Sequence, residues 1–121
     1  MKTVNLILLF ILPITISCGL LQTVYVEGKI YCDYASPFDK YYIALFDDEA
    51  FSRTLLADTT DNFRSETYSI KGSGYEVSTL DPYMEVTCIC NRYTFTKKID
   101  LNPYYERNGN IISVDIDCNR T

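Results

Sequence analysis

The sequence predicts an all-β domain, an antiparallel β-sandwich of about seven short strands. Three observations support this prediction. Apolar and polar residues alternate with a period of two along several segments, which is the spacing of a strand with one buried face. Turn-forming residues such as Gly72-Ser73-Gly74 and Asn108-Gly109 separate those segments. No segment after residue 19 sustains the 3.6-residue period of an amphipathic helix.

The predicted strands, in chain order, are residues 24–32, 41–47, 54–60, 67–71, 83–90, 93–101 and 111–118. Residues 24–32 place their even-numbered side chains on one face, which we expect to be buried. Residues 41–47 are apolar on both faces and predict a central strand. Residues 54–60 show a weaker pattern, and residues 67–71 are short enough to lie at a sheet edge.

Residues 1–19 predict a secretory signal peptide. Lys2 precedes an apolar run of about 13 residues, and the small residues Ser17 and Gly19 follow it. Those two residues fit the cleavage positions, and Thr15 with Ser17 is an alternative pair. An uncleaved membrane anchor is the less favoured alternative, because only a run that includes polar residues reaches spanning length. We therefore expect residues 20–121 to be a secreted, extracellular domain with no transmembrane span.

Composition excludes several classes of function. The chain has no His, which removes His-based acid–base catalysis and His-ligated zinc. Its 11 Lys+Arg against 16 Asp+Glu give a net charge of -5, so nucleic-acid binding is not expected. We predict no catalytic residues, no cofactor and no bound metal.

Four cysteines, Cys32, Cys88, Cys90 and Cys118, remain once Cys18 leaves with the leader. An even number in a short exported chain predicts two disulfides. Cys88 and Cys90 lie two apart on one strand, a poor geometry for bonding each other. Cys32 and Cys118 should therefore each pair with one of them; we favour Cys32–Cys88 and Cys90–Cys118. Buried free thiols and a four-thiolate zinc site are the less favoured alternatives.

Dispersed short segments between residues 20 and 105 resemble one known family. They are residues 24–32 (Val-Tyr-Val-Glu-Gly-Lys-Ile-Tyr-Cys), Ser36-Pro37, residues 43–47, residues 59–63, Ile70-Lys71-Gly72 and residues 81–90. On these segments the chain resembles the nematode transthyretin-like proteins. It differs from them at two places: Cys88 stands where the family has His, and the Gly expected near Phe63 is missing. The resemblance is that of a divergent member.

This resemblance implies a transthyretin-like (prealbumin-like) sandwich of two antiparallel sheets, secreted to the extracellular space. It implies no particular activity, because fold does not determine function. The related hydroxyisourate hydrolases use His residues and a C-terminal Tyr-Arg-Gly-Ser. This chain has no His and ends in Cys118-Asn119-Arg120-Thr121, so that hydrolysis is not expected.

Two weaker patterns concern acids and glycosylation. Asp47-Asp48-Glu49 with Asp58 and Asp61 could supply oxygen ligands to Ca²⁺. We favour the simpler interpretation of a solvated acidic loop. Asn119 opens an Asn-x-Thr sequon, which we expect to be unmodified.

Tyrosines in or beside loops are candidates for a recognition surface, because Tyr offers a large amphipathic contact area. The residues that we expect to be exposed are Tyr34, Tyr75, Tyr104 and Tyr105.

The predicted function is a secreted binding module without catalysis. Its partner would be an extracellular or cell-surface protein, a lipid or a small apolar ligand. An oligomeric, transthyretin-style carrier of a small hydrophobic ligand is one alternative. A carboxylate-dependent hydrolase is the other, less favoured because the acids are scattered along the sequence.

Overall fold

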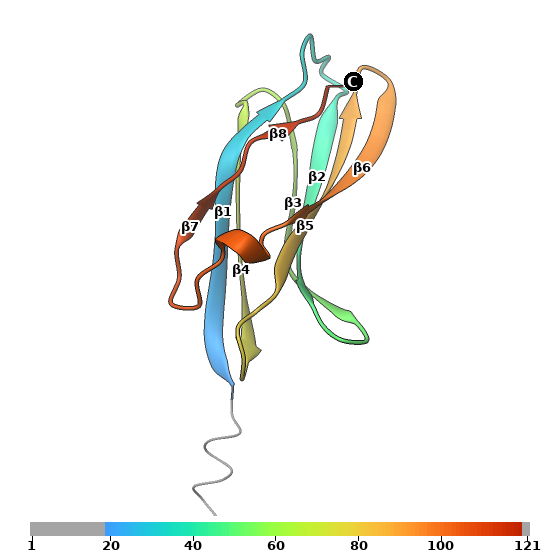
Figure 1. Cartoon of the computed structure of the whole chain (residues 1–121). Coiled ribbons are helices and arrows are strands. Elements are labelled where there is room, and N and C mark those ends of the chain that lie inside the picture. The colour runs from blue at the N-terminus through green and yellow to red at the C-terminus, as the bar shows by residue number, and fades with distance from the viewer. Residues whose placement is uncertain (1–18, 120–121) are drawn as a thin grey trace, which may run out of the picture.

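The computed structural model describes residues 19–119, which form two stacked β-sheets (Figure 1). In chain order the elements are β1 (Leu20–Tyr31), β2 (Lys40–Asp48), β3 (Arg53–Asn62), β4 (Thr67–Glu76), β5 (Pro82–Cys90), β6 (Tyr93–Asp100), a 3-10 turn η1 (Asn102–Tyr104), β7 (Ile111–Ser113) and β8 (Ile116–Asp117). This confirms the all-β class and gives eight strands where about seven were predicted. The predicted leader, residues 1–19, lies outside the described residues except for Gly19.

The strands divide between the sheets in a simple order. One sheet runs β4-β1-β7, with β8 also paired to β1, and the other runs β3-β2-β5-β6. β2 therefore lies inside its sheet, as the apolar pattern of residues 41–47 predicts. β4 lies at an edge, as predicted, but it extends to Glu76 and is longer than residues 67–71.

The C-terminal strand differs from the prediction in two ways. Residues 111–118 form two short strands rather than one, and both run parallel to β1, so the sandwich is not wholly antiparallel. The break lies at Val114, whose carbonyl accepts a hydrogen bond from the Tyr68 hydroxyl at 2.5 Å. Gly28 makes room for it, since a Cβ there would lie 1.9 Å from the Val114 carbonyl oxygen. Val114 still packs against the core, so apolar and polar residues continue to alternate in the sequence across the break.

The core lies between the sheets and follows the predicted parity. Even-numbered residues of β1 and β5 and odd-numbered residues of β2 point inward. The aliphatic side chains and methionine with no exposed area are Val24, Val26, Ile30, Ile43, Leu45, Met84, Val86 and Leu101. Burial of each such side chain contributes about 1.5–3 kcal/mol to folding.

One buried polar side chain, Gln22, joins three segments inside this core. Its Oε1 accepts hydrogen bonds from the Leu80 backbone N–H at 3.1 Å and the Tyr105 hydroxyl at 3.0 Å. Its Nε2 donates to the Ser78 carbonyl at 2.6 Å. Burying an amide is favourable only when its hydrogen bonds are satisfied, and here both ends of the amide are bonded.

Candidate functional site

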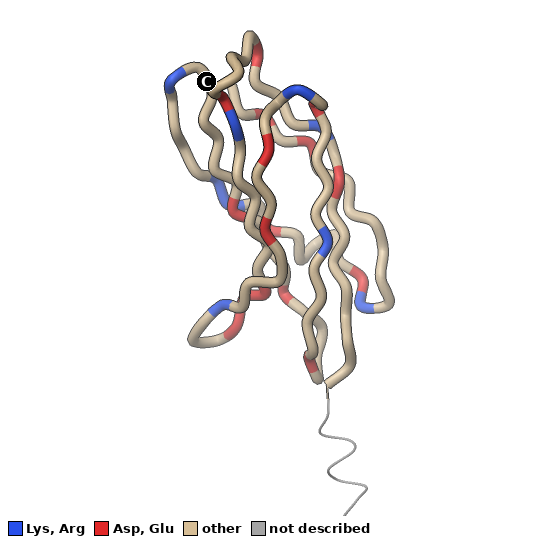
Figure 2. Tube along the Cα trace, turned by 180° about the vertical axis from the view of Figure 1, so that it is seen from behind, with Lys and Arg blue, Asp and Glu red and all other residues tan. Residues whose placement is uncertain are grey.

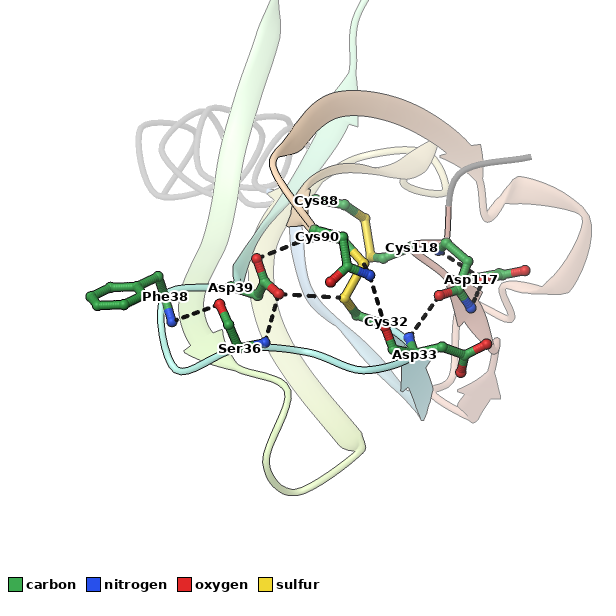
Figure 3. Close-up of a disulfide and its surroundings, with 11 residues drawn as sticks. Cys32, Asp33, Ser36, Phe38, Asp39, Cys88, Cys90, Asp117 and Cys118 are labelled. Carbon is green, nitrogen blue, oxygen red and sulfur yellow. Dashed lines mark hydrogen bonds between the residues drawn. A yellow bond between two sulfur atoms is a disulfide. The ribbon is translucent and has the colours of Figure 1, made fainter.

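Two disulfides join the sheets at one end of the sandwich, which we call the disulfide end (Figure 3). Cys32 bonds Cys90 with a Cα–Cα distance of 5.9 Å, and Cys88 bonds Cys118 at 5.6 Å. The presence of two bridges between the sheets agrees with the prediction, but the favoured pairing was wrong. Cys32 and Cys118 lie at the same level, since the Cys118 N–H donates to the Tyr31 carbonyl at 2.7 Å. Parity therefore allows both pairings, so it could not have selected the observed one.

The residue 33–39 loop follows Cys32 and connects the two sheets at this end. Asp39 closes it: its carboxylate accepts hydrogen bonds from the Ser36 N–H at 2.8 Å and from the Asn91 N–H at 3.1 Å. The Asp39 side chain is buried, and its own N–H donates to the Ser36 carbonyl at 3.1 Å. The loop is thereby tied to the turn between β5 and β6.

Asp33 is held at the other side of the same loop by two distant residues. Its N–H donates to the Asn119 side-chain oxygen at 2.7 Å, and its carbonyl accepts from the Asn91 side-chain amide at 2.8 Å. Asn91 adopts a positive φ of 51°, a conformation that Asn tolerates better than most residues. The loop is therefore anchored by a disulfide and by side chains from two other segments.

Two aromatic side chains stand out from this anchored loop. Tyr34 is 97% exposed and Phe38 is 87% exposed. Figure 3 shows Phe38 directed away from the hydrogen-bonded cluster around Asp39. Fixed loops that present exposed aromatic side chains are the usual architecture of recognition surfaces.

An open cavity of about 410 Å³ lies beside the loop. Its walls come from residues 34–37 on one side and residues 62–66 on the other, and Cys32 is among its lining residues. Asn62, Arg64 and Glu66 give it a mixed polar lining. Pockets for small apolar ligands are mostly apolar and enclose the ligand, whereas this cavity is open and polar. It is therefore better suited to contact with a protein surface.

The four predicted tyrosines do not form one surface. Tyr34, Tyr75 and Tyr104 are exposed, but Tyr75 lies opposite Leu21 near the start of β1, far from the disulfide end. Tyr105 is buried, which corrects the expectation that it is exposed. Burial raises its pKa, and its hydroxyl is held by Gln22 inside the core.

Phe38 is the residue that sequence reasoning missed. It falls between the predicted strands 24–32 and 41–47, where the alternation of a strand gives no indication of exposure. The sequence feature that could have indicated it is a large apolar side chain directly after the turn-forming residues Ser36-Pro37.

At the opposite end, three carboxylates come together. Ligand oxygens of Asp47, Glu49 and Glu76 all lie within 4.8 Å of one another. A hydrogen bond with Asp47, followed by burial, raises the pKa of Glu76. Asp47 also accepts the Asp81 N–H at 2.8 Å. Three carboxylates this close together favour protonation of Glu76, the member whose pKa is raised.

The acids expected to join Asp47 as calcium ligands are placed differently. Asp58 and Asp61 lie along β3 opposite Ala44 and Tyr41, and neither belongs to the three-carboxylate group. Glu76 comes instead from β4, in the other sheet. Figure 2 shows acidic residues at several separate places along the strands and loops.

A further pair of aromatics is covered rather than exposed. Phe46 and Tyr83 stack on the outer face of the second sheet with ring centroids 5.3 Å apart. Arg53 lies over the Phe46 ring and also forms an ion pair with Glu85 at 2.6 Å. Lys98 lies over the Tyr83 ring. These cations cover the pair, so it is less available for contact with a partner than Tyr34 and Phe38.

No protein-family model matches the chain, and neither does any curated protein or solved structure. Within residues 19–119, no helix has the length and apolar character needed to cross a bilayer.

Proposed function

We propose that this chain is a secreted binding domain with a transthyretin-like sandwich, and that it recognises an extracellular protein through the 33–39 loop. The observation that carries the proposal is the exposure of Tyr34 and Phe38 on a loop fixed by Cys32 and Asp39. A fixed loop loses little conformational entropy on binding, so its aromatic contacts contribute more fully to affinity. The two disulfides support an oxidising compartment, where such bonds persist.

A protein partner is favoured over a small apolar ligand or a lipid. The cavity beside the loop is open and carries Arg64 and Glu66, charges of both signs. Protein interfaces combine buried aromatic anchors with a polar rim, which is the pattern of this loop and cavity.

The oligomeric carrier is the second candidate, and the edge strand β6 argues against it. Lys97 lies on the inner face of β6 between Phe95 and Ile99, and its ammonium donates to the Asp117 carbonyl at 2.6 Å. An inward-pointing charge on an edge strand is a common device that prevents pairing with another chain.

A carboxylate-dependent hydrolase remains the less favoured alternative. The oxygens of Asp47 and Glu76 lie within 4.8 Å of each other, and Asp47 accepts the Asp81 N–H at 2.8 Å. These contacts give the carboxyls a structural role, so we propose a function without catalysis.

The test compares three immobilised proteins in extracellular fluid from the source organism: wild type, the double variant Tyr34→Ser/Phe38→Ser, and Phe51→Ser. Phe51 is the matched control, because it is a fully exposed aromatic in the hairpin between β2 and β3, at the far end of the sandwich. We expect one protein to be retained by wild type and Phe51→Ser and lost from the double variant. Equal retention by all three, or retention of lipid alone, would overturn the proposal.

A further inference from the structure

We propose that the Cys32–Cys90 disulfide is a thiol-sensitive latch for the 33–39 loop, and that Cys88–Cys118 is the permanent link between the sheets. The two bridges differ in access. Cys32 is partly exposed and lines the open cavity, whereas Cys88 and Cys118 have no exposed area. Thiol–disulfide exchange requires an attacking thiolate to reach a sulfur, so only the Cys32–Cys90 bridge offers an entry from the surface.

The surroundings also favour one direction of attack. Cys32 is one of the residues that line the cavity, and the Asp39 carboxylate lies 3.9 Å from its sulfur. The Cys90 sulfur is buried, and the Asn91 side-chain amide donates toward it at 3.6 Å. A thiolate that leaves from Cys90 is stabilised by this donor, while one at Cys32 is opposed by the Asp39 charge.

The reaction is an ordinary exchange with a low-molecular-weight thiol. The external thiolate bonds to the Cys32 sulfur, the Cys32–Cys90 bond breaks, and its electron pair goes to Cys90, which then takes up a proton. A second thiol displaces the first from Cys32. The protein disulfide is reduced to two thiols, and two external thiols are oxidised to one disulfide.

Opening the latch removes the covalent anchor at the start of the loop. Cys88–Cys118 continues to join the sheets, so the sandwich is retained while Tyr34 and Phe38 lose their fixed positions. Loss of partner binding on reduction is the part that rests on the proposed function. The selectivity of the reduction does not rest on it.

The experiment exposes the oxidised protein to a dithiothreitol series, alkylates with N-ethylmaleimide and maps the labelled peptides. We expect Cys32 and Cys90 to be labelled roughly tenfold faster than Cys88 and Cys118, with the circular dichroism unchanged at that stage. Labelling of all four cysteines together, or only on unfolding, would overturn the latch and leave the proposed binding function standing.

A pair of variants adds a second readout. Cys32→Ser/Cys90→Ser imitates the open latch, and we expect chymotrypsin to cleave it after Tyr34 or Phe38 faster than the oxidised wild type. Cys88→Ser/Cys118→Ser is the matched control and should keep the slow cleavage of the loop. If the first variant does not fold, reduction of the wild-type protein followed by the same proteolysis supplies the measurement. Equal cleavage before and after selective reduction would also overturn the proposal.

Discussion

The Asp39 carboxylate accepts a hydrogen bond from the backbone N–H of Asn91 at 3.1 Å, across 52 residues of sequence. The same carboxylate accepts the Ser36 N–H at 2.8 Å, and the side chain is only 5% exposed. One buried anion therefore fixes the exposed loop to the turn between β5 and β6. Hydrogen bonds to a charged acceptor are stronger than neutral ones, which makes Asp39 the main noncovalent anchor of this end.

Replacing Asp39 with Ala should destabilise the domain by about 1–3 kcal/mol, because two backbone N–H groups lose their acceptor in a buried site. Asp39→Asn keeps one acceptor oxygen and should cost less. The measurement is urea unfolding followed by circular dichroism. Asp58→Ala, an exposed acid on β3, is the control and should change the midpoint little. An Asp39→Ala midpoint equal to the control would contradict this anchoring role.

The strands that sequence predicts best are those with one fully buried face. Val24, Val26 and Ile30 alternate with polar or half-exposed neighbours, and the structure places all three between the sheets. The same holds for Met84 and Val86 on β5. A period of two has one physical cause here, since side chains alternate across a strand, so parity alone identifies the buried face.

What sequence could not predict depends on contacts between distant segments. The break at Val114 follows from the close approach of Gly28. Beside it, the Lys29 N–H donates a hydrogen bond to the Asp115 carboxylate, 86 residues later in the sequence. The burial of Tyr105 follows from Gln22, which lies at the other end of the chain. Local spacing contains no information on either contact, and the loop position of Phe38 has the same difficulty.

Gly28→Ala should destabilise the domain severely, because the new methyl group would lie 1.9 Å from the Val114 carbonyl oxygen. We expect a loss of at least about 3 kcal/mol, or no folded protein, since backbone on both sides must move. Gly109→Ala is the matched control. Its methyl meets open space, and only the positive φ of 90° opposes it, at about 1 kcal/mol. Thermal melts of the two variants give the comparison, and similar melting temperatures would contradict the close approach.

Tyr68 should make the fold sensitive to alkali. Burial raises its pKa above the ordinary value of 10.0, and the Asp115 carboxylate raises it further. The protonated hydroxyl donates to the Val114 carbonyl. Its stabilisation is therefore complete below the unfolded-state pKa and is lost as the pH rises toward the folded-state pKa. Urea midpoints of wild type should fall more steeply above about pH 10 than those of Tyr68→Phe. Parallel curves for the two proteins would show that Tyr68 does not titrate with unfolding.

Glu76 should also stabilise the fold only while it is protonated, but in the acid range of pH. Its hydrogen bond with Asp47, and then its burial, raise its pKa above the ordinary value of 4.5. The folded state binds the proton more tightly than the unfolded state, so this contribution is complete below pH 4.5 and is lost as the pH rises through the folded-state pKa. Glu76→Gln keeps a hydrogen-bond donor toward Asp47 without the charge. We expect it to remove part of the decline in stability with rising pH, and to be at least as stable as wild type at pH 7. Asp58→Asn is the control and should follow the wild-type pH curve. A Glu76→Gln protein that is less stable at pH 7, with an unchanged pH dependence, would show that Glu76 does not bind its proton more tightly in the folded state.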